Sequence, residues 1–312
     1  MSFTHIIPHM SAYLHPLLYA LPVALSASLI EALVLARRRP GNYDWKGAGV
    51  SMLDQLGHQL LAFLPLSLAT PVFAFAWEHR ISTIGLNTGW AFLALFIGQE
   101  FFYYWYHRSA HRVRWFWATH AVHHSPNELN LSAAYRLGWT GKLTGNTLFY
   151  TPLAWLGFRP EVVLLTLSLN LLYQFWIHAT WIPKLGWLEY IFNTPSAHRV
   201  HHASNLRYLD ANYGGVLIVF DRLFGTYIPE SEQEACRYGL VTPIAGYNLF
   251  KIEFHAWGSL FRDVAHARSA REVLGYLFMP PGWRPDGPGG TTEELRRCQL
   301  ERQALDRAFA AR

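Results

Sequence analysis

Long apolar runs separated by short polar links fill the first half of the chain. The first run, Ser11 to Ala36, contains Glu31 as its only charged residue and is followed by the basic cluster Arg37 to Arg39. A helix of this length can cross a bilayer. No lysine or arginine precedes the run, and it is longer than a secretory signal. We therefore expect it to be retained as the first membrane helix.

Two further apolar runs predict a helical hairpin. They extend from Leu53 to Trp77 and from Thr88 to Tyr106, and the short polar link Glu78 to Asn87 lies between them. Runs of about twenty residues are long enough to cross a bilayer. Because the link is short, the two helices are expected to be antiparallel neighbours.

A second apolar pair, Leu143 to Leu156 and Val162 to Trp176, is interrupted at Gly157 to Pro160. Each half is rather short for a full crossing, so the pair predicts a helical hairpin that either crosses the membrane or re-enters it. The positive-inside rule puts Arg37 to Arg39 in the cytoplasm, and with them the chain that follows Tyr106.

The rest of the chain is more polar. Residues 179–227 are polar and aromatic, and from Phe250 onward helical patterns alternate with a Pro/Gly loop at 280–290. These parts are expected to form a helical cap on the cytoplasmic side. We therefore predict an all-α, multi-pass integral membrane protein with about four transmembrane or re-entrant helices and a helical cytosolic cap.

Composition supports a membrane location. The chain is 51% hydrophobic, 16% aromatic and only 15% charged, which is too few charges for an ordinary soluble domain. Cys236 and Cys298 form no CxxC pair and cannot build a disulfide framework. The net charge of +5 is modest, and the basic residues are scattered, so no nucleic-acid partner is expected.

Histidine is the unusual residue, with 16 copies, and eight of them follow spacing patterns. One pair is spaced i, i+4, so on a helix both imidazoles would project from one face. An HxxHH pattern then occurs twice, and its spacing lets one helical turn serve two metal ions. A lone histidine after the second hairpin is a further candidate ligand. These residues are His107 and His111, then His120, His123 and His124, then His198, His201 and His202, and finally His178.

Eight or nine imidazoles exceed the needs of one tetrahedral ion, so the pattern indicates two metals. Paired ions suit the activation of dioxygen for attack on a C–H bond, because that reaction needs several electrons and open coordination positions. Iron is therefore favoured over zinc, and the predicted cofactor is a pair of iron ions.

The three boxes, HRSAH at 107–111, HAVHH at 120–124 and HRVHH at 198–202, resemble in order and spacing those of the fatty acid hydroxylase and sterol desaturase superfamily of membrane di-iron enzymes. The resemblance extends from about Gln99 to Ile228. The segments NTPSAHRVHH at 193–202, NYGGV at 212–216 and DRLFGT at 221–226 look especially like the alkylglycerol monooxygenase branch.

The resemblance implies that the eight box histidines hold the metals and that His178 corresponds to an additional histidine after the hairpin. It also implies a small set of membrane helices beneath a helical cytosolic cap. We divide the chain accordingly into N-terminal membrane helices at 1–106, a catalytic domain at 99–228 that includes the 143–178 hairpin, and a C-terminal cytosolic helical extension at 229–312.

The chain has no HPGG-type haem segment, no nucleotide-binding glycine motif and no cysteine cluster for iron and sulfur, so an external electron donor is expected. The alkylglycerol monooxygenase branch implies tetrahydrobiopterin. Other members of the superfamily imply a separate haem or ferredoxin protein.

Metal-bound imidazoles usually donate their second N–H to a carboxylate or a carbonyl. Glu100 lies two helical turns before His107 in an apolar run, where an unpartnered carboxylate is costly, and Asp210 follows the third box. Both are candidates for this supporting role. A further group is expected to bond ligands or a lipid headgroup: Asn130, Asn193, Asn212 and Tyr213.

The predicted function is a membrane-bound di-iron oxygenase that hydroxylates or desaturates a C–H bond of a lipid. A sterol desaturase or sterol-methyl oxidase would share every ligand, and a histidine-rich zinc protein or transporter is the alternative of another class. A zinc hydrolase would need only three ligands and an open water site. The alanine- and arginine-rich composition favours a bacterial inner membrane over an endoplasmic reticulum membrane.

Overall fold

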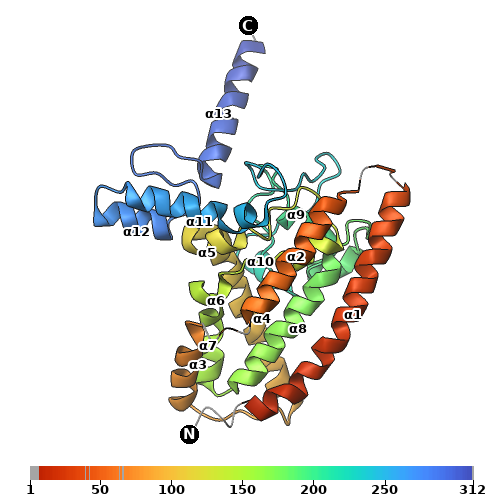
Figure 1. Cartoon of the computed structure of the whole chain (residues 1–312). Helices are drawn as coiled ribbons and strands as arrows, with labels where there is room; N and C mark the ends of the chain where they lie inside the picture. Colours follow the sequence, from red (N-terminus) through yellow and green to blue (C-terminus); the bar gives the residue numbers. More distant parts are fainter. Residues whose placement is uncertain (1–6, 39, 42, 63, 65–66, 311–312) are drawn as a thin grey trace.

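Helices form every extended regular element of the computed structural model, which describes residues 7–38, 40–41, 43–62, 64 and 67–310 (Figure 1). Residues 1–6 and Arg39 of the predicted N-terminal region lie outside this description. Within the described ranges, β-structure is limited to isolated bridges such as Phe192 with Leu217. The α-helices are α1 (Ile7–Arg38), α2 (Trp45–Ala62), α3 (Ala69–Glu78), α4 (Gly89–Arg112), α5 (Arg114–His120), α6 (Gly141–Thr144), α7 (Thr151–Leu156), α8 (Pro160–Ile177), α9 (Pro195–His201), α10 (Val219–Leu223), α11 (Leu249–Ala265), α12 (Ala270–Phe278) and α13 (Thr292–Ala310). Short 3₁₀ helices are η2 (Leu131–Tyr135), η3 (Asn146–Tyr150) and η4 (Gly186–Tyr190).

The single membrane helix predicted over Leu53 to Trp77 is wrong. α2 ends at Ala62, and α3 begins at Ala69 as a separate short helix. Pro65 lies in the intervening sequence, and a proline inside a helix removes one hydrogen bond and clashes with the preceding turn. The backbone N–H of Leu68 donates to the carbonyl of Lys142, so the link is joined to a distant segment.

The predicted hairpin at 143–176 has unequal arms. The first arm consists of the short helices α6, η3 and α7, interrupted at Gly145, whose φ of 82° suits glycine. The second arm, α8, is a continuous helix of 18 residues. Gly157 turns the chain between them with a φ of 126°.

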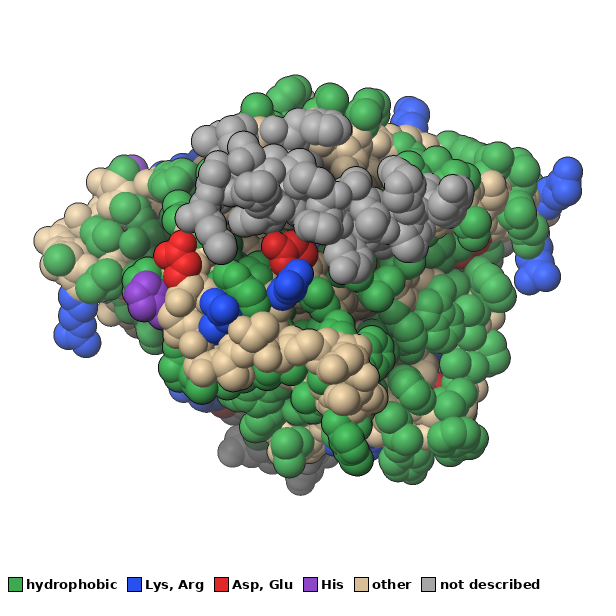
Figure 2. Space-filling model, turned by 90° about the horizontal axis from the view of Figure 1, so that it is seen from below, with side chains coloured by type: hydrophobic (Ala, Val, Ile, Leu, Met, Phe, Trp, Pro, Cys, Tyr) green, Lys and Arg blue, Asp and Glu red, His purple; other side chains and the backbone are tan. Residues whose placement is uncertain are grey.

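Two helices, α1 over Ala20–Arg38 and α8 over Pro160–Ile177, are long and apolar enough to cross a membrane. Only 22% of each segment is buried inside the protein, which distinguishes them from core helices of a soluble domain. Figure 2 shows that hydrophobic side chains cover much of the surface at the end of the bundle opposite α13.

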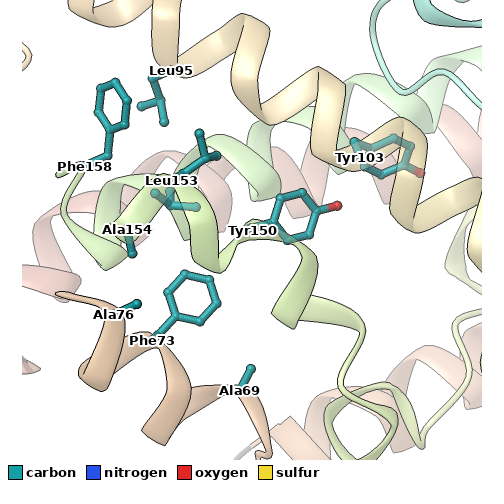
Figure 3. Close-up of a cluster of buried hydrophobic side chains, with 10 residues drawn as sticks. Ala69, Phe73, Ala76, Leu95, Tyr103, Tyr150, Leu153, Ala154 and Phe158 are labelled. Carbon is teal, nitrogen blue, oxygen red and sulfur yellow. The ribbon is translucent and has the colours of Figure 1, made fainter. Parts of the chain in front are cut away.

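A core of apolar side chains joins α3, α4, η3 and α7 (Figure 3). Phe73 of α3 and Leu153 of α7 point into this cluster, where Tyr150 and Tyr103 also lie. Leu95 and Tyr103 come from α4, so the cluster fixes the lower part of the helix that carries the first histidine box. Its buried members expose 5% of their surface or less.

The C-terminal helices form a separate layer across one end of the bundle. In Figure 1, α11 and α12 run across the direction of α1, α2, α4 and α8, while α13 points away from them. α11 packs against α5 and α2, through Ile252 with Val50 and Val122, and through Leu260 and Trp257 with Ala118. The histidine boxes on α4, α5 and α9 lie under this layer.

Candidate metal centre

Nine histidines converge at the junction of the bundle and the C-terminal layer. They form two neighbouring sets, and the candidate ligand atoms of each set lie within 4.8 Å of one another. The first set has five members, His107, His111, His120, His124 and His201, and the second has four, His123, His178, His198 and His202. The structure thus brings together the eight histidines that the sequence pattern selected and the lone candidate His178.

α4 carries the first pair. It continues without interruption past Tyr106 to Arg112, so His107 and His111 project from one face, and their ring centroids lie 5.3 Å apart. Both belong to the first set. α5 ends at His120 and continues as a turn through His124.

The two HxxHH boxes distribute their side chains in opposite senses. In the box on α5, His120 and His124 face the first set and His123 faces the second. In the box on α9, His198 and His202 face the second set and His201 faces the first. In each box the first and last histidines, spaced i, i+4, share one face of the helical turn, and the histidine at i+3 points toward the other set. Each box therefore contributes to both sets.

The start of α9 is defined by the sequence before it. Thr194 caps the helix through its side-chain oxygen, which accepts from Ala197 N, and Pro195 occupies the first turn. Both residue types are favoured at these positions. Buried Arg199 fixes the outer side of the helix by an ion pair with Glu230 at 2.7 Å.

Backbone carbonyls accept hydrogen bonds from the Nδ1 atoms of four of the rings. The pairs are His107 with Tyr213 O (2.9 Å), His123 with Arg136 O (3.0 Å), His178 with Gln174 O (2.8 Å) and His201 with Ala211 O (2.9 Å). A carbonyl can only accept, so each of these rings carries its proton on Nδ1. The Nε2 lone pair is left to face the centre, as in metal-ligating histidines.

The spacing of the Nε2 atoms fits metal ions. Neighbouring Nε2 atoms are 3.0 Å apart in His107 and His120, 3.2 Å in His178 and His198, and 3.1 Å in His198 and His202. The Nε2 atoms of His111 and His201 are buried without a hydrogen-bond partner. Nitrogens bound to one ion at about 2.1 Å would be about 3.0 to 3.4 Å apart. Lone pairs this close repel unless a cation lies between them, so the residues fit a metal in each set.

Burial keeps the imidazoles in the form that binds metal. It lowers the pKa of His123 to about 4 and that of His178 to about 3. Burial is also the main cause of the low pKa of several others, namely His107, His120, His124, His198, His201 and His202. These rings are therefore neutral near pH 7, and neutral imidazole is the ligand form.

Asp210 lies beside the first set. Its Oδ1 is 3.8 Å from His111 Nδ1, and its Oδ2 accepts from Arg112 at 2.8 Å. Burial would raise the pKa of Asp210, but His111 and Arg112 hold it at about 2. The residue has a φ of 55°, and Arg112 also pairs with Glu293 of α13 at 2.5 Å. Asp210 thus connects a metal-facing histidine to the last helix.

Glu100 bonds to the backbone of a supporting loop and to Asn170. Its Oε2 accepts from the backbone N–H groups of Val216 and Leu217, each at 2.8 Å, and its Oε1 accepts from Asn170. These bonds hold the 213–217 loop, whose Tyr213 carbonyl accepts from His107. Glu100 therefore supports the site through the backbone.

Asp221 has the same kind of role, which the sequence reasoning missed. Its carboxylate accepts from Tyr213 N, Gly214 N and Thr226 Oγ1, each at 2.7 Å. The sequence signal that could have identified Asp221 is its position in the DRLFGT segment, which follows the third histidine box. The carbonyl acceptors could not be found this way, because every residue type has a carbonyl.

The predicted lipid-contact residues are engaged by the protein itself. Asn130 Oδ1 accepts from Ser132 N and caps η2. Asn193 Nδ2 donates to Gly214 O, and Asn212 Nδ2 donates to Ala197 O and Ile228 O. Tyr213 is buried, and its ring contacts those of His107, His111 and His201. All four lie in or near the supports of the two histidine sets.

A cavity of about 590 Å³ opens onto the centre. Its inner wall includes His111, His124 and His201 of the first set and His202 of the second. Trp117 also lines it, and its ring lies 5.3 Å from that of His111. The outer wall comes from the C-terminal part of the chain: the 239–245 loop, Lys251 and His255 of α11, the prolines at 280–281 and Leu295 of α13. The wall combines apolar side chains with the polar groups of the histidines, Asp210 and Lys251, as small-molecule sites do.

Comparison with known proteins agrees with this site. The fatty acid hydroxylase family matches residues 92–226, the segment that holds all nine histidines. Alkylglycerol monooxygenase of Homo sapiens is 38% identical over 88% of this chain and 62% of its own length. The Danio rerio protein of the same name is 37% identical over 76% of this chain and 52% of its own length. Ornithine lipid hydroxylase OlsE of Rhizobium tropici is 31% identical over 47% of this chain and 44% of its own.

The chain spans less than two thirds of the length of these relatives. No solved structure matches it. The resemblance inferred from the three histidine boxes is confirmed, including the alkylglycerol monooxygenase branch.

Proposed function

Since residues 92–226 match the fatty acid hydroxylase family, we propose that the chain is a membrane-bound non-haem di-iron oxygenase. It hydroxylates, or desaturates, a C–H bond of a lipid with dioxygen and an external reductant. The observation that carries the proposal is the division of nine imidazoles, eight of them buried, into sets of five and four beside one cavity. A zinc hydrolase would need only about three of them.

Each set would hold one iron. The five histidines of the first set and the four of the second offer ring nitrogens to a metal. The four carbonyl acceptors keep His107, His123, His178 and His201 in the tautomer with a free Nε2. When bound, paired irons supply the binding of dioxygen and the electrons for its reduction. The remaining chemistry belongs to the protein: binding the lipid, orienting it and excluding bulk water.

The cavity supports the assignment of the substrate site. It exposes His111, His124 and His201 to a bound molecule, while most of the second set lies behind them. Its apolar wall suits an alkyl chain, and Trp117 limits how the chain can approach His111. In this proposal the residues that line the cavity contact the lipid. Asn130, Asn193, Asn212 and Tyr213 support the metal centre.

The reductant is external. Alkylglycerol monooxygenases are the relatives with the highest identities quoted above, and the resemblance to that branch supports tetrahydrobiopterin. A haem or ferredoxin protein is the second donor to test.

In the proposed topology the chain is multi-pass, its catalytic side faces the cytoplasm, and the membrane is the bacterial inner membrane. The proposed parts of the chain are the N-terminal membrane helices at 1–106, the catalytic domain at 99–228 and the C-terminal cytosolic extension at 229–312.

The first test is the metal content of detergent-purified protein, measured by mass spectrometry and by Mössbauer spectroscopy on iron-enriched material. Two coupled irons per chain are expected. Stoichiometric zinc without iron in carefully purified protein would reject the oxygenase.

Two variants test the two sets separately. We expect His201→Ala and His123→Ala each to lower the iron content and to abolish oxygen-dependent turnover of membrane lipids, because each removes one ligand of a different set. His266→Ala is the matched control, since His266 is exposed at the end of α11. Product analysis by mass spectrometry distinguishes hydroxylation from desaturation. Full turnover in both box variants would contradict the proposal.

A further inference from the structure

The outer face of α11 and α12 carries large apolar side chains that the described part of the protein leaves uncovered. Phe250, Phe254 and Phe261 of α11 expose 66%, 43% and 55% of their surface. Leu274 and Phe278 of α12 each expose 56%. Exposed apolar side chains gathered on neighbouring helices mark an interaction surface.

On α11 these side chains share one face. Residues on a helix advance by 100°, so Phe250, Phe254 and Phe261 lie within about 40° of one another. Ile252 and Leu260, about 160° and 80° from Phe250 on the wheel, are buried against the bundle and α5. α11 therefore packs through these positions and leaves much of its phenylalanine surface exposed.

The phenylalanine face continues the apolar flank of α2. Trp139 contacts Phe250 and Phe254, with ring centroids 5.9 and 6.3 Å apart, and its Nε1 donates to Asp54 O of α2 at 3.0 Å. Gly57 of α2 also faces the Trp139 indole. It follows Trp45 by twelve residues, about 18 Å along the helix. The exposed leucines of α2 lie on either side of Gly57 along the helix: Leu53, Leu56 and Leu60, at 58%, 56% and 61% exposure.

Unpaired basic side chains lie beside the apolar face. Within the described ranges, Lys251, Arg262 and Arg271 form no ion pair, whereas the nearby acids Asp263, Glu272 and Asp286 are paired with arginines. Lys251 and Arg262 lie about 100° and 120° from Phe250 on the wheel. Phenylalanine on one face with lysine and arginine beside it is the composition of helices that lie in a membrane interface.

We propose that α11 and α12 lie in the membrane interface, with their phenylalanine and leucine side chains among the acyl chains and their basic rim at the phospholipid phosphates. The occupant of this face is the bilayer, because the face is continuous with the apolar flank of α2. Figure 1 fits this placement, since α11 and α12 run across the direction of α1, α2 and α8.

The proposal has a consequence for the cavity. Lys251 and His255, on the flank of α11 next to the phenylalanine face, line the cavity that reaches His111 and His201. With α11 in the interface, the cavity opens beside the lipid. A lipid then reaches the metal centre sideways, with its polar head near Lys251.

Spin labels measure the depth of this face in the full-length protein in phospholipid nanodiscs. The native Cys298 is exposed on α13, which points away from the bundle, and serves as the aqueous reference. Cys236 is partly buried and is replaced by serine. Single labels are placed at Phe254→Cys, Phe261→Cys and Phe278→Cys with Cys298→Ser, and Arg262→Cys is the matched position on the basic flank. Each label is tested against oxygen, which concentrates among acyl chains, and against a water-soluble nickel chelate.

We expect the three phenylalanine positions to be relaxed more strongly by oxygen than by the chelate, and Cys298 to show the opposite order. The label at position 262 is expected to give an intermediate ratio of relaxation by oxygen to relaxation by the chelate. Labels at 261 and 278 as accessible to the chelate as Cys298 would overturn the proposal. Labels shielded from both agents would also overturn it, because a second protein would then cover the face. Neither readout depends on turnover, so the result is independent of the proposed enzymatic activity.

Discussion

At the scale of single residues, the metal centre depends on groups that hold the histidines in place. Four rings donate to backbone carbonyls, and the loop that supplies Tyr213 O is held by Glu100 and Asp221. Supporting groups of this kind normally contribute strongly to metal affinity. The side chains that matter most after the histidines are therefore those that fix loop 211–217.

Asp210 gives the residue-scale prediction. Asp210→Asn removes the charge beside His111 and Arg112 but tolerates the φ of 55°. We expect metal affinity to fall by about 10- to 100-fold, measured as iron lost during titration with a chelator. Asp210→Ala should lose iron similarly and also unfold at a lower temperature, since alanine at positive φ costs about 1 to 2 kcal/mol. Unchanged iron retention in both variants would remove Asp210 from the support of His111.

At the scale of elements, α2 connects the membrane helices to the C-terminal layer through Trp139. Its Nε1 donates to Asp54 O, its N–H donates to Glu253 Oε2 of α11, and its ring packs on Gly57. Close packing of an indole on a helix backbone requires a residue without a side chain. Gly57 therefore lets the Trp139 ring pack closely against α2, and Trp139 in turn bonds to Glu253 of α11.

Two glycines of α2 provide a matched test. A Cβ at Gly57 would overlap the Trp139 ring, whereas a Cβ at Gly49 would meet nothing within 4 Å. Gly57→Ala should destabilise the protein by about 1 to 3 kcal/mol. Gly49→Ala should be neutral or stabilise it by up to about 1 kcal/mol, because alanine is the better helix former. Thermal unfolding in detergent measures both, and equal midpoints for the two variants would contradict this account of the packing.

At the scale of the whole molecule, one buried acidic contact joins the N-terminal and C-terminal parts. Asp54 of α2 and Glu253 of α11 each have a buried carboxylate oxygen without a separate partner. Burial and, next, the neighbouring Asp54 raise the pKa of Glu253 far above its usual value of 4.5. The folded protein therefore binds a proton here that the unfolded chain has released.

The pH dependence follows from that proton. Above the ordinary pKa of a glutamate, the folded state holds more protons than the unfolded state, so stability falls as pH rises. We expect the unfolding midpoint to decrease between about pH 5 and about pH 9, and Glu253→Gln to flatten this slope, because glutamine is permanently neutral and can still accept from Trp139 N. The exposed Glu301→Gln is the control and should keep the wild-type slope. An equal slope in the Glu253 variant would assign the effect to other groups.

Some features of this protein follow from the sequence alone. The i, i+4 and HxxHH spacings are local, so they determine which imidazoles share a helical face, and they selected eight of the nine histidines that the structure brings together. The ninth, His178, was predicted only from its place after the second hairpin. The apolar length of α1 is also local and predicted a helix that suits a bilayer. Val162 to Trp176 was predicted to be rather short for a crossing, whereas α8 is long enough for one. The break between α2 and α3 was missed because hydropathy alone does not weigh a single proline.

Tertiary structure alone decided how these parts combine. The division into sets of five and four depends on α9 approaching α4 and α5 from a distant part of the chain. The carbonyls of Tyr213, Arg136 and Gln174 carry no sequence signal. The outer wall of the cavity comes from residues 239–295, outside the family match. Periodicity records only which face of a helix is apolar, and what that face meets depends on contacts between residues far apart in sequence.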